Sequence, residues 1–402
     1  MEWEVVKLKD HIEQIRGVTY KGSDSRKEEF KNSIAILRSN NIGEGVINYD
    51  NLVFVNKTYA KDFQRLQLND ILITASTGSK KVIGKNGAIS NEIESSFGAF
   101  CKVVRPLETV NPSYLKHFFQ TKRYRTTIRN VINGANINNI RTRDIDNLKI
   151  PLPPLPIQKK IAAILDAADD YRQKTKALLD KYDELTQSIF LDMFGDPVRN
   201  EKGWEVRGLE EVSTIGSGIT KGRKLKSDMS LQLPYMRVAN VQDGYLSLDE
   251  IKLIPGSEAD LIKYGLEVGD VLLTEGGDPD KLGRGAIWNG EIPNCVHQNH
   301  IFKVRLNHQY LLSEYFSKLC GSIYGKRYFL KRAKQTTGIA TINKTQLKAF
   351  PCYIPPLEVQ TEFVSMILEI NTQIDFLKNG VHKSEQLFQS LLQRAFKGEL
   401  VN

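Results

Sequence analysis

Residues 153–158 read Pro-Pro-Leu-Pro-Ile-Gln, and about 200 residues later the chain repeats this pattern as Pro-Pro-Leu-Glu-Val-Gln at residues 355–360. Further matches between the two halves of the 402-residue chain occur in the same order. They are Trp3-Glu4-Val5 with Trp204-Glu205-Val206, residues 69–74 with 269–274, residues 87–89 with 285–287, and residues 122–124 with 326–328. Ordered matches at a nearly constant separation indicate an internal duplication, in which one structural unit is encoded twice.

The proline clusters divide each copy into two parts of different character. Ahead of each cluster, short runs rich in apolar and β-branched residues, such as residues 70–74 and 270–274, alternate with glycine-rich turns and short helical segments. We call these parts, residues 1–150 and 197–354, the first and second heads, and expect each to be a mixed α/β domain. Asn111-Pro112 is expected to begin a helix, because Asn caps a helix N-terminus and Pro fits the first turn.

Each proline cluster is followed by a long helical pattern, in residues 151–196 and 355–402. Apolar residues recur there at alternating spacings of three and four, which is typical of the contact line of a coiled coil and which we call the seam. Its predicted members are Ile157, Ile161, Ile164, Ala168, Tyr171, Thr175, Leu178, Tyr182, Leu185 and Ile189 in the first helix, and Val359, Phe363, Met366, Ile370, Gln373, Leu377, Gly380, Ser384, Leu387 and Leu391 in the second.

The second helical pattern is weaker in its middle, where Ile374, Val381 and Phe388 indicate a local register shift. Gly195 and Gly398 are expected to end the two helices, since glycine readily adopts the left-handed conformation that follows a helix C-terminus.

The order head, helix, head, helix predicts that the two helices pair with each other as an antiparallel coiled coil, related by a pseudo-two-fold repeat, with a head at each end. A helix of about 35 residues is ~52 Å long, which corresponds to roughly 15 base pairs of B-DNA. A coiled coil that serves only to dimerise the chain is the alternative interpretation.

The net charge of +9 is concentrated in the heads. Residues 1–150 contain 24 Lys and Arg against 16 Asp and Glu, and residues 200–354 contain 21 against 17, whereas the helical segments are slightly acidic. Basic domains are suited to a polyphosphate partner, because each neutralised phosphate releases counterions. Double-stranded DNA is therefore a candidate partner.

Composition excludes several other classes. No stretch approaches the ~18 uncharged apolar residues of a membrane span, and the first residues lack the pattern of a signal peptide, so we expect a cytoplasmic protein. The four cysteines, Cys101, Cys295, Cys320 and Cys352, lack the paired spacing of a zinc site and are expected to be reduced, buried thiols.

No motif for chemistry is complete. Residues 111–114, Asn-Pro-Ser-Tyr, resemble the Asn-Pro-Pro-Tyr of amino-methyltransferases, but no glycine-rich turn for a methyl donor precedes them. Residues 78–86 depart from a phosphate-binding loop in glycine spacing and in the magnesium-binding hydroxyl, and Pro279-Asp280 is not followed by the rest of a nuclease motif. His297 and His300 have no acidic partner nearby in sequence, so no metal site is expected.

The junctions carry a family resemblance. Residues 150–155 with Gln158, residues 193–197 leading to residues 202–204, and residues 396–400 resemble the linkers of the specificity subunits of type I restriction-modification systems. That resemblance implies a non-catalytic subunit in which each head reads one half of a bipartite, asymmetric DNA site and the helices set the spacing. It also implies two methyltransferase subunits docked on the helices and a restriction/translocase subunit. S-adenosylmethionine, ATP and Mg²⁺ would belong to those partners.

Three segments of each head are candidates for DNA contact: the loop after the Asp-x-Leu strand, the basic helix, and the Gly/Asn/Thr-rich loop ahead of the prolines. We assign base readout to the last loop and phosphate contact to the basic helix; the alternative for each is a solvated turn or helix face. The candidate side chains are Ser76, Thr77, Lys80, Lys81, Lys85, Lys122, Arg123, Arg125, Arg129, Asn133, Asn136, Asn138, Asn139, Arg141 and Arg143 in the first head, and Lys281, Arg284, Lys326, Arg327, Lys331, Lys334, Thr336, Thr337, Thr341, Asn343 and Lys344 in the second.

These loops differ between the heads, so the two half-sites are expected to differ. A free-standing two-headed DNA-binding regulator would share the architecture and is the alternative function. A single-chain modification enzyme would need a methyl-donor motif, which the sequence lacks.

Overall fold

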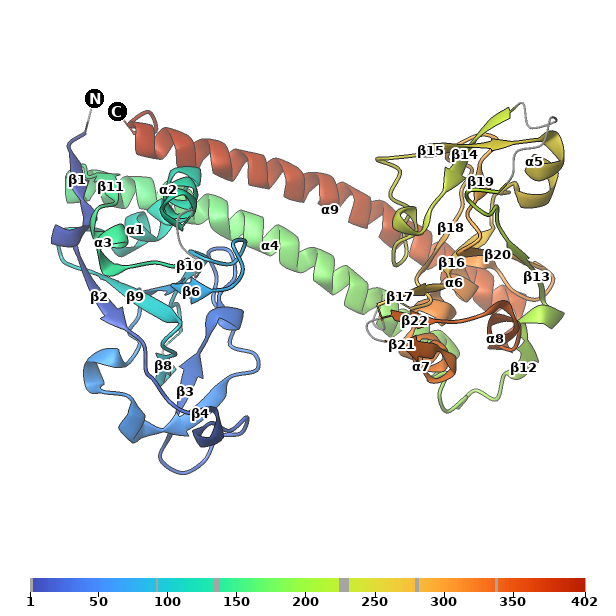
Figure 1. The fold of residues 1–402 in the computed structure, drawn as a ribbon, viewed down its shortest axis with the longest axis horizontal. Coiled ribbons are helices and arrows are strands. Elements are labelled where there is room, and N and C mark those ends of the chain that lie inside the picture. The colour runs from blue at the N-terminus through green and yellow to red at the C-terminus, as the bar shows by residue number, and fades with distance from the viewer. Residues whose placement is uncertain are drawn as a thin grey trace. The chain divides into compact units, whose positions relative to one another are not determined.

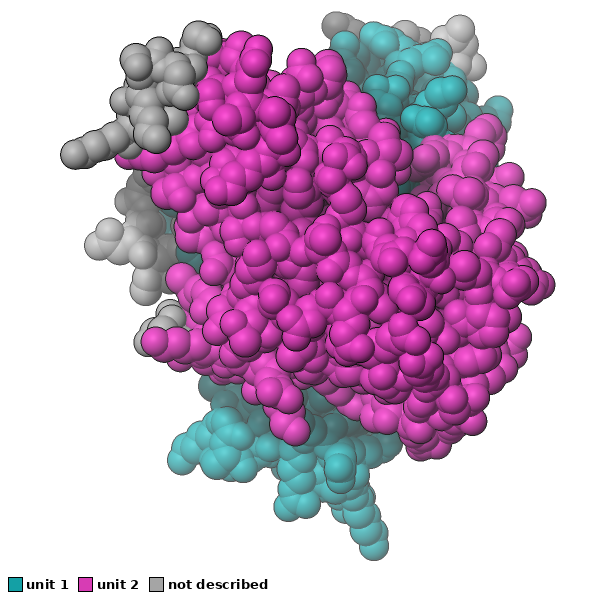
Figure 2. Space-filling view, turned by 90° about the vertical axis from the view of Figure 1, so that its right-hand side faces the viewer, with its two compact units in different colours: residues 1–178, 377–402 teal, residues 179–376 magenta. Residues whose placement is uncertain are grey.

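The computed structural model describes residues 3–91, 93–132, 138–223, 231–278, 282–336 and 339–401, with only the backbone of residues 131, 132, 138 and 336. The chain forms two compact units (Figure 2), one of residues 1–178 and 377–402 and the other of residues 179–376. Each unit contains one head and part of each long helix, α4 (Leu155–Phe194) and α9 (Leu357–Lys397). Within the described residues, no helix is long and apolar enough to span a membrane.

The first unit is built on two main sheets (Figure 1). A four-stranded antiparallel sheet has the order β2-β9-β5-β7 (Ile12–Arg16, Cys101–Pro106, Ile71–Thr74, Asn86–Ala88). A three-stranded sheet has the order β4-β3-β8 (Val53–Asn56, Ser33–Leu37, Ser95–Phe97), in which β3 is parallel to β8. Two-stranded ladders join β1 (Val5–Lys7) to β11 (Lys149–Pro151) and β6 (Ser76–Thr77) to β10 (Asn138–Asn139). The helices of this head are α1 (Pro112–Phe118), α2 (Lys122–Ile132) and α3 (Thr142–Asp146).

The second unit repeats this plan. Its four-stranded sheet has the order β13-β20-β16-β18 (Ser213–Ser217, Ile301–Leu306, Val271–Thr274, Gly285–Ile287), and its three-stranded sheet has the order β15-β14-β19 (Lys252–Gly256, Leu231–Met236, Val296–His297). β12 (Glu205–Gly208) pairs with β23 (Pro351–Ile354). A small three-stranded sheet has the order β17-β22-β21 (Gly276–Gly277, Ile339–Thr341, Lys334–Thr336). The helices are α5 (Glu258–Tyr264), α6 (Ser313–Gly321), α7 (Ile323–Arg332) and α8 (Lys344–Lys348). The duplication predicted from the sequence is therefore present in the fold, as is the mixed α/β class.

The repeated Asp of residues 70 and 270 holds the central strands. Arg105 donates two hydrogen bonds of 2.8 Å to the Asp70 carboxylate, and Arg305 donates the same pair to Asp270. Each carboxylate also accepts a bond from a backbone N–H, that of Gln67 or Glu267. Both carboxylates are about 1% exposed, so a bidentate arginine is needed to offset the cost of burying the charge.

The repeated Gln attaches each head to its helix. Gln158 Oε1 accepts from Asn111 N at 2.8 Å while its Nε2 donates to Pro153 O. Gln360 makes the same two bonds, to Leu312 N and Pro355 O. Both side chains are almost fully buried, and a buried amide with both ends satisfied fixes the exit of the helix from the proline cluster.

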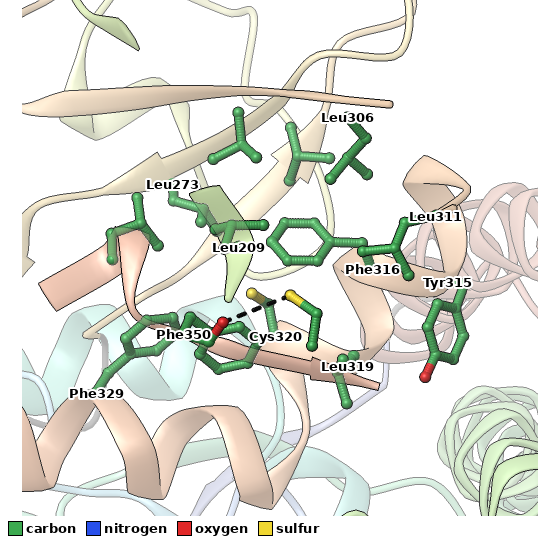
Figure 3. Close-up of a cluster of buried hydrophobic side chains, with 14 of the residues drawn as sticks. Leu209, Leu273, Leu306, Leu311, Tyr315, Phe316, Leu319, Cys320, Phe329 and Phe350 are labelled. Atoms are coloured by element: carbon green, nitrogen blue, oxygen red, sulfur yellow. Dashed lines mark hydrogen bonds between the residues drawn. The ribbon is translucent and has the colours of Figure 1, made fainter. Parts of the chain in front are cut away.

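The core of each head is completed by both long helices. In the first unit, Ile161 and Leu165 of α4 and Phe388 and Leu392 of α9 belong to the same buried cluster as the head residues Leu8 and Tyr114. In the second unit, the corresponding set includes Phe190, Phe194, Phe363 and Ile367. Figure 3 shows part of that second core, where Phe350, the residue before β23, lies beside Phe329 and near Phe316. The ring centroid of Phe350 is 5.2 Å from that of Phe329 and 6.2 Å from that of Phe316.

The predicted helix ends are confirmed. Asn111 caps α1 by accepting a hydrogen bond from Tyr114 N. α4 ends at Phe194 and α9 at Lys397, and the glycines that follow, Gly195 and Gly398, have φ of +78° and +81°.

An antiparallel arrangement of α4 and α9 is visible within the first unit. Arg172 Nη1 bonds both oxygens of Glu385 at 3.1 Å, and three residues further along α4 a Cβ on Gly380 would lie 3.7 Å from Thr175. Contacts therefore move toward the start of α9 as α4 advances. The predicted pairing of the two helices is confirmed, although seven of the 20 predicted seam residues are exposed.

The seam lies one residue further along than predicted at every second position. Ile161 is fully buried as expected, but Leu165 and Arg172 are buried in place of Ile164 and Tyr171. The predicted members that are exposed instead are Ile164 (38%), Tyr171 (58%), Leu178 (45%), Leu185 (45%), Met366 (37%), Leu387 (52%) and the polar Gln373. Phe363 and Ile370 are buried, and Ile157, Tyr182, Ile189, Leu377 and Leu391 are half-buried.

Spacing alone allowed two registers, because apolar residues stand side by side in α4, as at Ile164-Leu165 and Leu178-Leu179. Arg172 decides between them: its guanidinium lies 4.4 Å from the Phe388 ring centroid and donates to Asp169 and Glu385. A charged residue satisfied in this way can occupy the seam, while Tyr171 keeps its hydroxyl in water. The register shift expected in the second helix is also wrong, since Phe388 is buried in one continuous register with Phe363, Ile367 and Ile370.

Neighbouring residues of α4 give a direct test of this register. We expect Leu165→Ala to lower the free energy of unfolding by about 2–5 kcal/mol, because it empties a fully buried site. Ile164→Ala should cost less than about 1 kcal/mol, because Ile164 is already partly in water. Urea unfolding of both variants measures the difference, and equal losses would contradict the register described here.

Candidate nucleic-acid interface

The three candidate segments of the first head meet at one edge. β6 pairs antiparallel with β10, so that Ser76 lies opposite Asn139, and Ile140 N donates to Ala75 O at 2.8 Å. The loop after the central strand and the loop before the prolines thus form one short ribbon.

The basic helix α2 packs against the same loop. Arg125 donates to the carbonyl oxygens of Ile83 and Lys81 at 3.0 and 3.2 Å, and the buried Tyr124 hydroxyl donates to Gly84 O at 3.0 Å. Gly84 has a φ of +73°, and a Cβ there would lie 2.8 Å from the side chain of Ile128. Glycine is therefore required for the loop to turn this closely over α2.

The second head brings its three segments together in the same way. Gly276 lies opposite Thr341 across β17 and β22, Thr341 lies opposite Lys334 across β22 and β21, and Ile342 N donates to Glu275 O at 2.9 Å. Gly283, with a φ of +70°, turns over α7 so closely that a Cβ would lie 2.4 Å from the Phe329 ring.

Most described candidate side chains at these edges are exposed, as contact with DNA would require. The exposed candidates are Lys80, Lys81, Lys122, Arg123, Arg129, Asn139, Arg141, Arg143, Lys326, Arg327, Lys331, Lys334, Thr341, Asn343 and Lys344, and the half-buried ones are Ser76, Thr77, Lys85, Arg125 and Arg284. Asn133, Asn136, Lys281 and Thr337 lie outside the described residues, as do the side chains of Asn138 and Thr336.

Several described candidates are engaged inside their own head. Besides Arg125, Arg284 donates to Gln242 Oε1 at 3.0 Å, and Lys326 forms a 2.8 Å ion pair with Asp243. Asn343 caps α8 by accepting from Gln346 N. These side chains shape the surface, and the remaining exposed Lys and Arg supply its positive charge.

Three further residues lie at the foot of the ribbons: Phe100 in the first head, and Glu275 and His300 in the second. Phe100 and His300 are exposed and Glu275 is half-buried. Glu275 begins the candidate loop after the Asp-x-Leu strand, whereas sequence reasoning assigned no DNA contact to Phe100 or His300. The N–H groups of Ala75 and Ser76 both donate to Phe100 O, and Glu275 N donates to His300 O. These bonds bring together residues that are 25 positions apart, so no local sequence signal marks the contacts.

The other groups singled out from the sequence are structural. All four cysteines are buried, and burial raises the pKa of the Cys101 and Cys295 thiols to about 12. His297 is fully buried with Nδ1 3.0 Å from Ile301 O, and desolvation lowers its pKa to about 4. Among the described residues, no group of three or more His, Cys, Asp or Glu side chains is arranged to hold a metal ion.

The long helices present a second functional surface. Within the first unit, Ile164, Tyr171 and Leu178 follow one another at heptad spacing on one face of α4, and each is 38–58% exposed. We call this set the α4 stripe. A row of partly exposed apolar side chains beside a filled seam is typical of a surface that binds another protein.

Asp166 joins α4 to the first head next to this stripe. Its Oδ1 accepts hydrogen bonds from Ser113, Lys116 and His117 of α1 at 2.6, 2.6 and 2.8 Å. Desolvation alone would raise the pKa of Asp166, but the bonds from His117, Lys116 and Ser113 outweigh it and hold the pKa below its ordinary value. The charged carboxylate thereby fixes α1 on the helix.

Comparison with known proteins gives one consistent result. The sequence model of a family described as "Type I restriction modification DNA specificity domain" matches residues 1–182 and again residues 201–383. The specificity subunit of the type I restriction enzyme StySPI from Salmonella potsdam is 30% identical over 99% of this chain and 89% of its own length. The EcoKI specificity subunit from Escherichia coli K12 is 29% identical over 99% and 89%. A crystal structure of a type I restriction-modification S subunit from M. genitalium shares the fold, with a TM-score of 0.55 and 15% identity over 98% of this chain and 96% of that one.

The engaged and the exposed basic residues of α2 should behave differently. Replacing Lys122 and Arg129 by Ala is expected to weaken binding to all DNA duplexes alike and to reduce the slope of log K against log salt by about two, because two phosphate contacts are lost. Arg125→Ala should instead lower the thermal stability of the chain, because two loop carbonyls lose their donor. Fluorescence anisotropy across a salt series, with thermal unfolding of each variant, separates the two effects; an unchanged salt slope in the double variant would contradict the assignment.

Proposed function

The chain belongs to the type I restriction-modification DNA specificity family, and on that premise we propose that its two heads read the two halves of one bipartite DNA site. The observation that carries the proposal is that one scaffold occurs twice with different side chains at the same exposed edge. A scaffold shared by both heads places each reading edge in the same way, and different edges accept different bases. The half-sites are therefore unlike each other.

The differences lie in the ribbons themselves. Ser76 and Thr77 in the first head correspond to Gly276 and Gly277 in the second, and Asn139 is replaced at the neighbouring strand by Thr341. Hydroxyl and amide groups bond base edges directly, whereas glycines allow closer approach of the backbone. Exposed Lys and Arg of α2 and α7 bind phosphates in both heads and position the duplex without selecting its sequence.

The long helices set the number of base pairs between the half-sites. α4 and α9 have 40 and 41 residues, and at ~1.5 Å per residue a helix of that length is ~60 Å long. Because the seam is a filled core, the helices act as stiff elements and not as a flexible linker.

Methyltransferase subunits dock on the helices, and the α4 stripe is the surface that supports this part of the proposal. Methylation and cleavage belong to these subunits and to a restriction/translocase subunit, together with S-adenosylmethionine, ATP and Mg²⁺. The chain itself contributes DNA recognition and assembly.

Methylation gives the first test. In the host, the modified adenines are expected to define a bipartite sequence whose halves differ, and deleting the gene for this chain should abolish modification at those positions. Sequencing of modified adenines before and after deletion measures both. A palindromic target, or methylation that persists in the deletion strain, would refute the proposal.

The docking surface gives the second test. Tyr171→Glu combined with Leu178→Glu places two charges in the α4 stripe, so the purified chain should fail to form a complex with the methyltransferase encoded beside it while keeping its affinity for DNA. Ile262→Glu, at an 86% exposed position of α5, is the matched control and should assemble normally. Size-exclusion chromatography of the mixtures reads the result, and full assembly of the double variant would exclude this stripe as the docking surface.

A further inference from the structure

One position at the surface, formed by two residues side by side, differs in chemistry between the heads although the backbone around it is the same. Ala75 N donates to Phe100 O at 2.9 Å in the first head, and Glu275 N donates to His300 O at 3.0 Å in the second. Ala75 O and Glu275 O in turn accept from Ile140 N and Ile342 N at 2.8 and 2.9 Å. Phe100 and His300 therefore occupy equivalent places, and so do Ala75 and Glu275.

The side chains of Phe100, Glu275 and His300 are not used by the core of either head, whereas Ala75 is buried. Phe100 is 69% exposed, so most of its ring lies in water. The His300 side chain is 57% exposed, and its Nδ1 lies 2.7 Å from Glu275 Oε2. A carboxylate can only accept, so His300 Nδ1 carries the hydrogen and holds Glu275 in one orientation.

This position lies at the foot of each candidate DNA-binding ribbon. Ser76 N donates to Phe100 O, and Ser76 lies opposite Asn139 across the ribbon. In the second head, Glu275 directly precedes Gly276, which lies opposite the exposed Thr341. A duplex that contacts the ribbon therefore comes within reach of this position.

Building on the proposed function, we propose that this position selects one base pair in each half-site: Phe100 contacts a thymine methyl group, and Glu275, oriented by His300, accepts a hydrogen bond from an exocyclic amino group of cytosine or adenine. An aromatic ring offers apolar contact, which in the major groove only the thymine C5-methyl group matches. A carboxylate accepts from amino groups and is repelled by the O6, N7 and O4 acceptors of the other bases. In the strongly negative field of DNA, an unmatched carboxylate opposes binding, so Glu275 acts chiefly by excluding wrong bases.

The test selects sequences from a randomised duplex library with the chain assembled on its methyltransferase. The wild-type complex is expected to enrich a bipartite sequence. Glu275→Gln should reduce the preference at a single base position of one half-site by about tenfold, because an amide can donate as well as accept, and should leave the other half-site unchanged. His300→Gln, which removes the group that orients Glu275, should weaken the preference at the same position.

Phe100 has a test of its own that uses one missing methyl group. Replacing a single thymidine of the selected half-site by deoxyuridine should weaken binding of the wild-type complex at one position. The same replacement should have no effect on Phe100→Ser, because that variant has already lost the ring.

Matched controls change similar residues away from the ribbons. Phe63→Ser replaces another exposed phenylalanine (54%) of the first head, and Glu205→Gln breaks the exposed ion pair with Arg207 in the second. Both controls should select the wild-type sequence. If the wild-type complex selects no bipartite sequence, the proposed function fails; if it does and the variants of Phe100, Glu275 and His300 select the same sequence as the controls, this inference alone is overturned.

Discussion

Each head depends on burying part of both long helices. The cluster that contains the head residue Tyr114 also contains Leu165 of α4 and Phe388 of α9, and in the second unit Tyr315 stacks on Phe190 of α4 while Phe363 comes from α9. An isolated amphipathic helix cannot stably bury its apolar face in water, and a head without the helices would leave part of its core open. The last residues of the chain are for this reason part of the first unit, with the first residues. In each unit the seam residues and the head therefore fold together, and this packing fixes the edge of the head on its helices.

Much of this organisation could be predicted because it leaves a local or repeated signal. Asn111 and Pro112 specify a helix start by their own chemistry, Gly195 and Gly398 specify helix ends, and duplicated segments specify that whatever forms once forms twice. The repeated Asp70 is explained only by the structure, in which it forms a buried pair with Arg105. Arg105 lies 35 residues further along the chain and belongs to no motif, so the sequence did not indicate this pair.

The seam register and the reading edge could not be predicted, for two physical reasons. Where Ile164 and Leu165 are both apolar, helical spacing does not choose between them, and the choice is made by Arg172, whose burial depends on Glu385 and Phe388 from the other helix. Basic residues near a candidate DNA surface are equally ambiguous in sequence. Arg125 uses its guanidinium on two carbonyl groups of its own head, while Lys122 on the same helix remains exposed.

The same helices that carry the seam also carry the α4 stripe, and this couples two properties of the molecule. The seam pattern repeats every seven positions, so an insertion of seven residues in each helix would preserve the packing of Leu165 and Phe388 and of every layer like it. An insertion of another length would rotate Arg172 out of the seam and turn Tyr171 or its neighbours inward. A change in helix length therefore preserves the seam only in steps that keep both helices in register, and each such step also lengthens the α4 stripe by one exposed position. Recognition by the heads carries no such restriction, because Phe100, Glu275 and His300 lie at the tips of strands whose buried ends are held separately by Asp70 and Asp270.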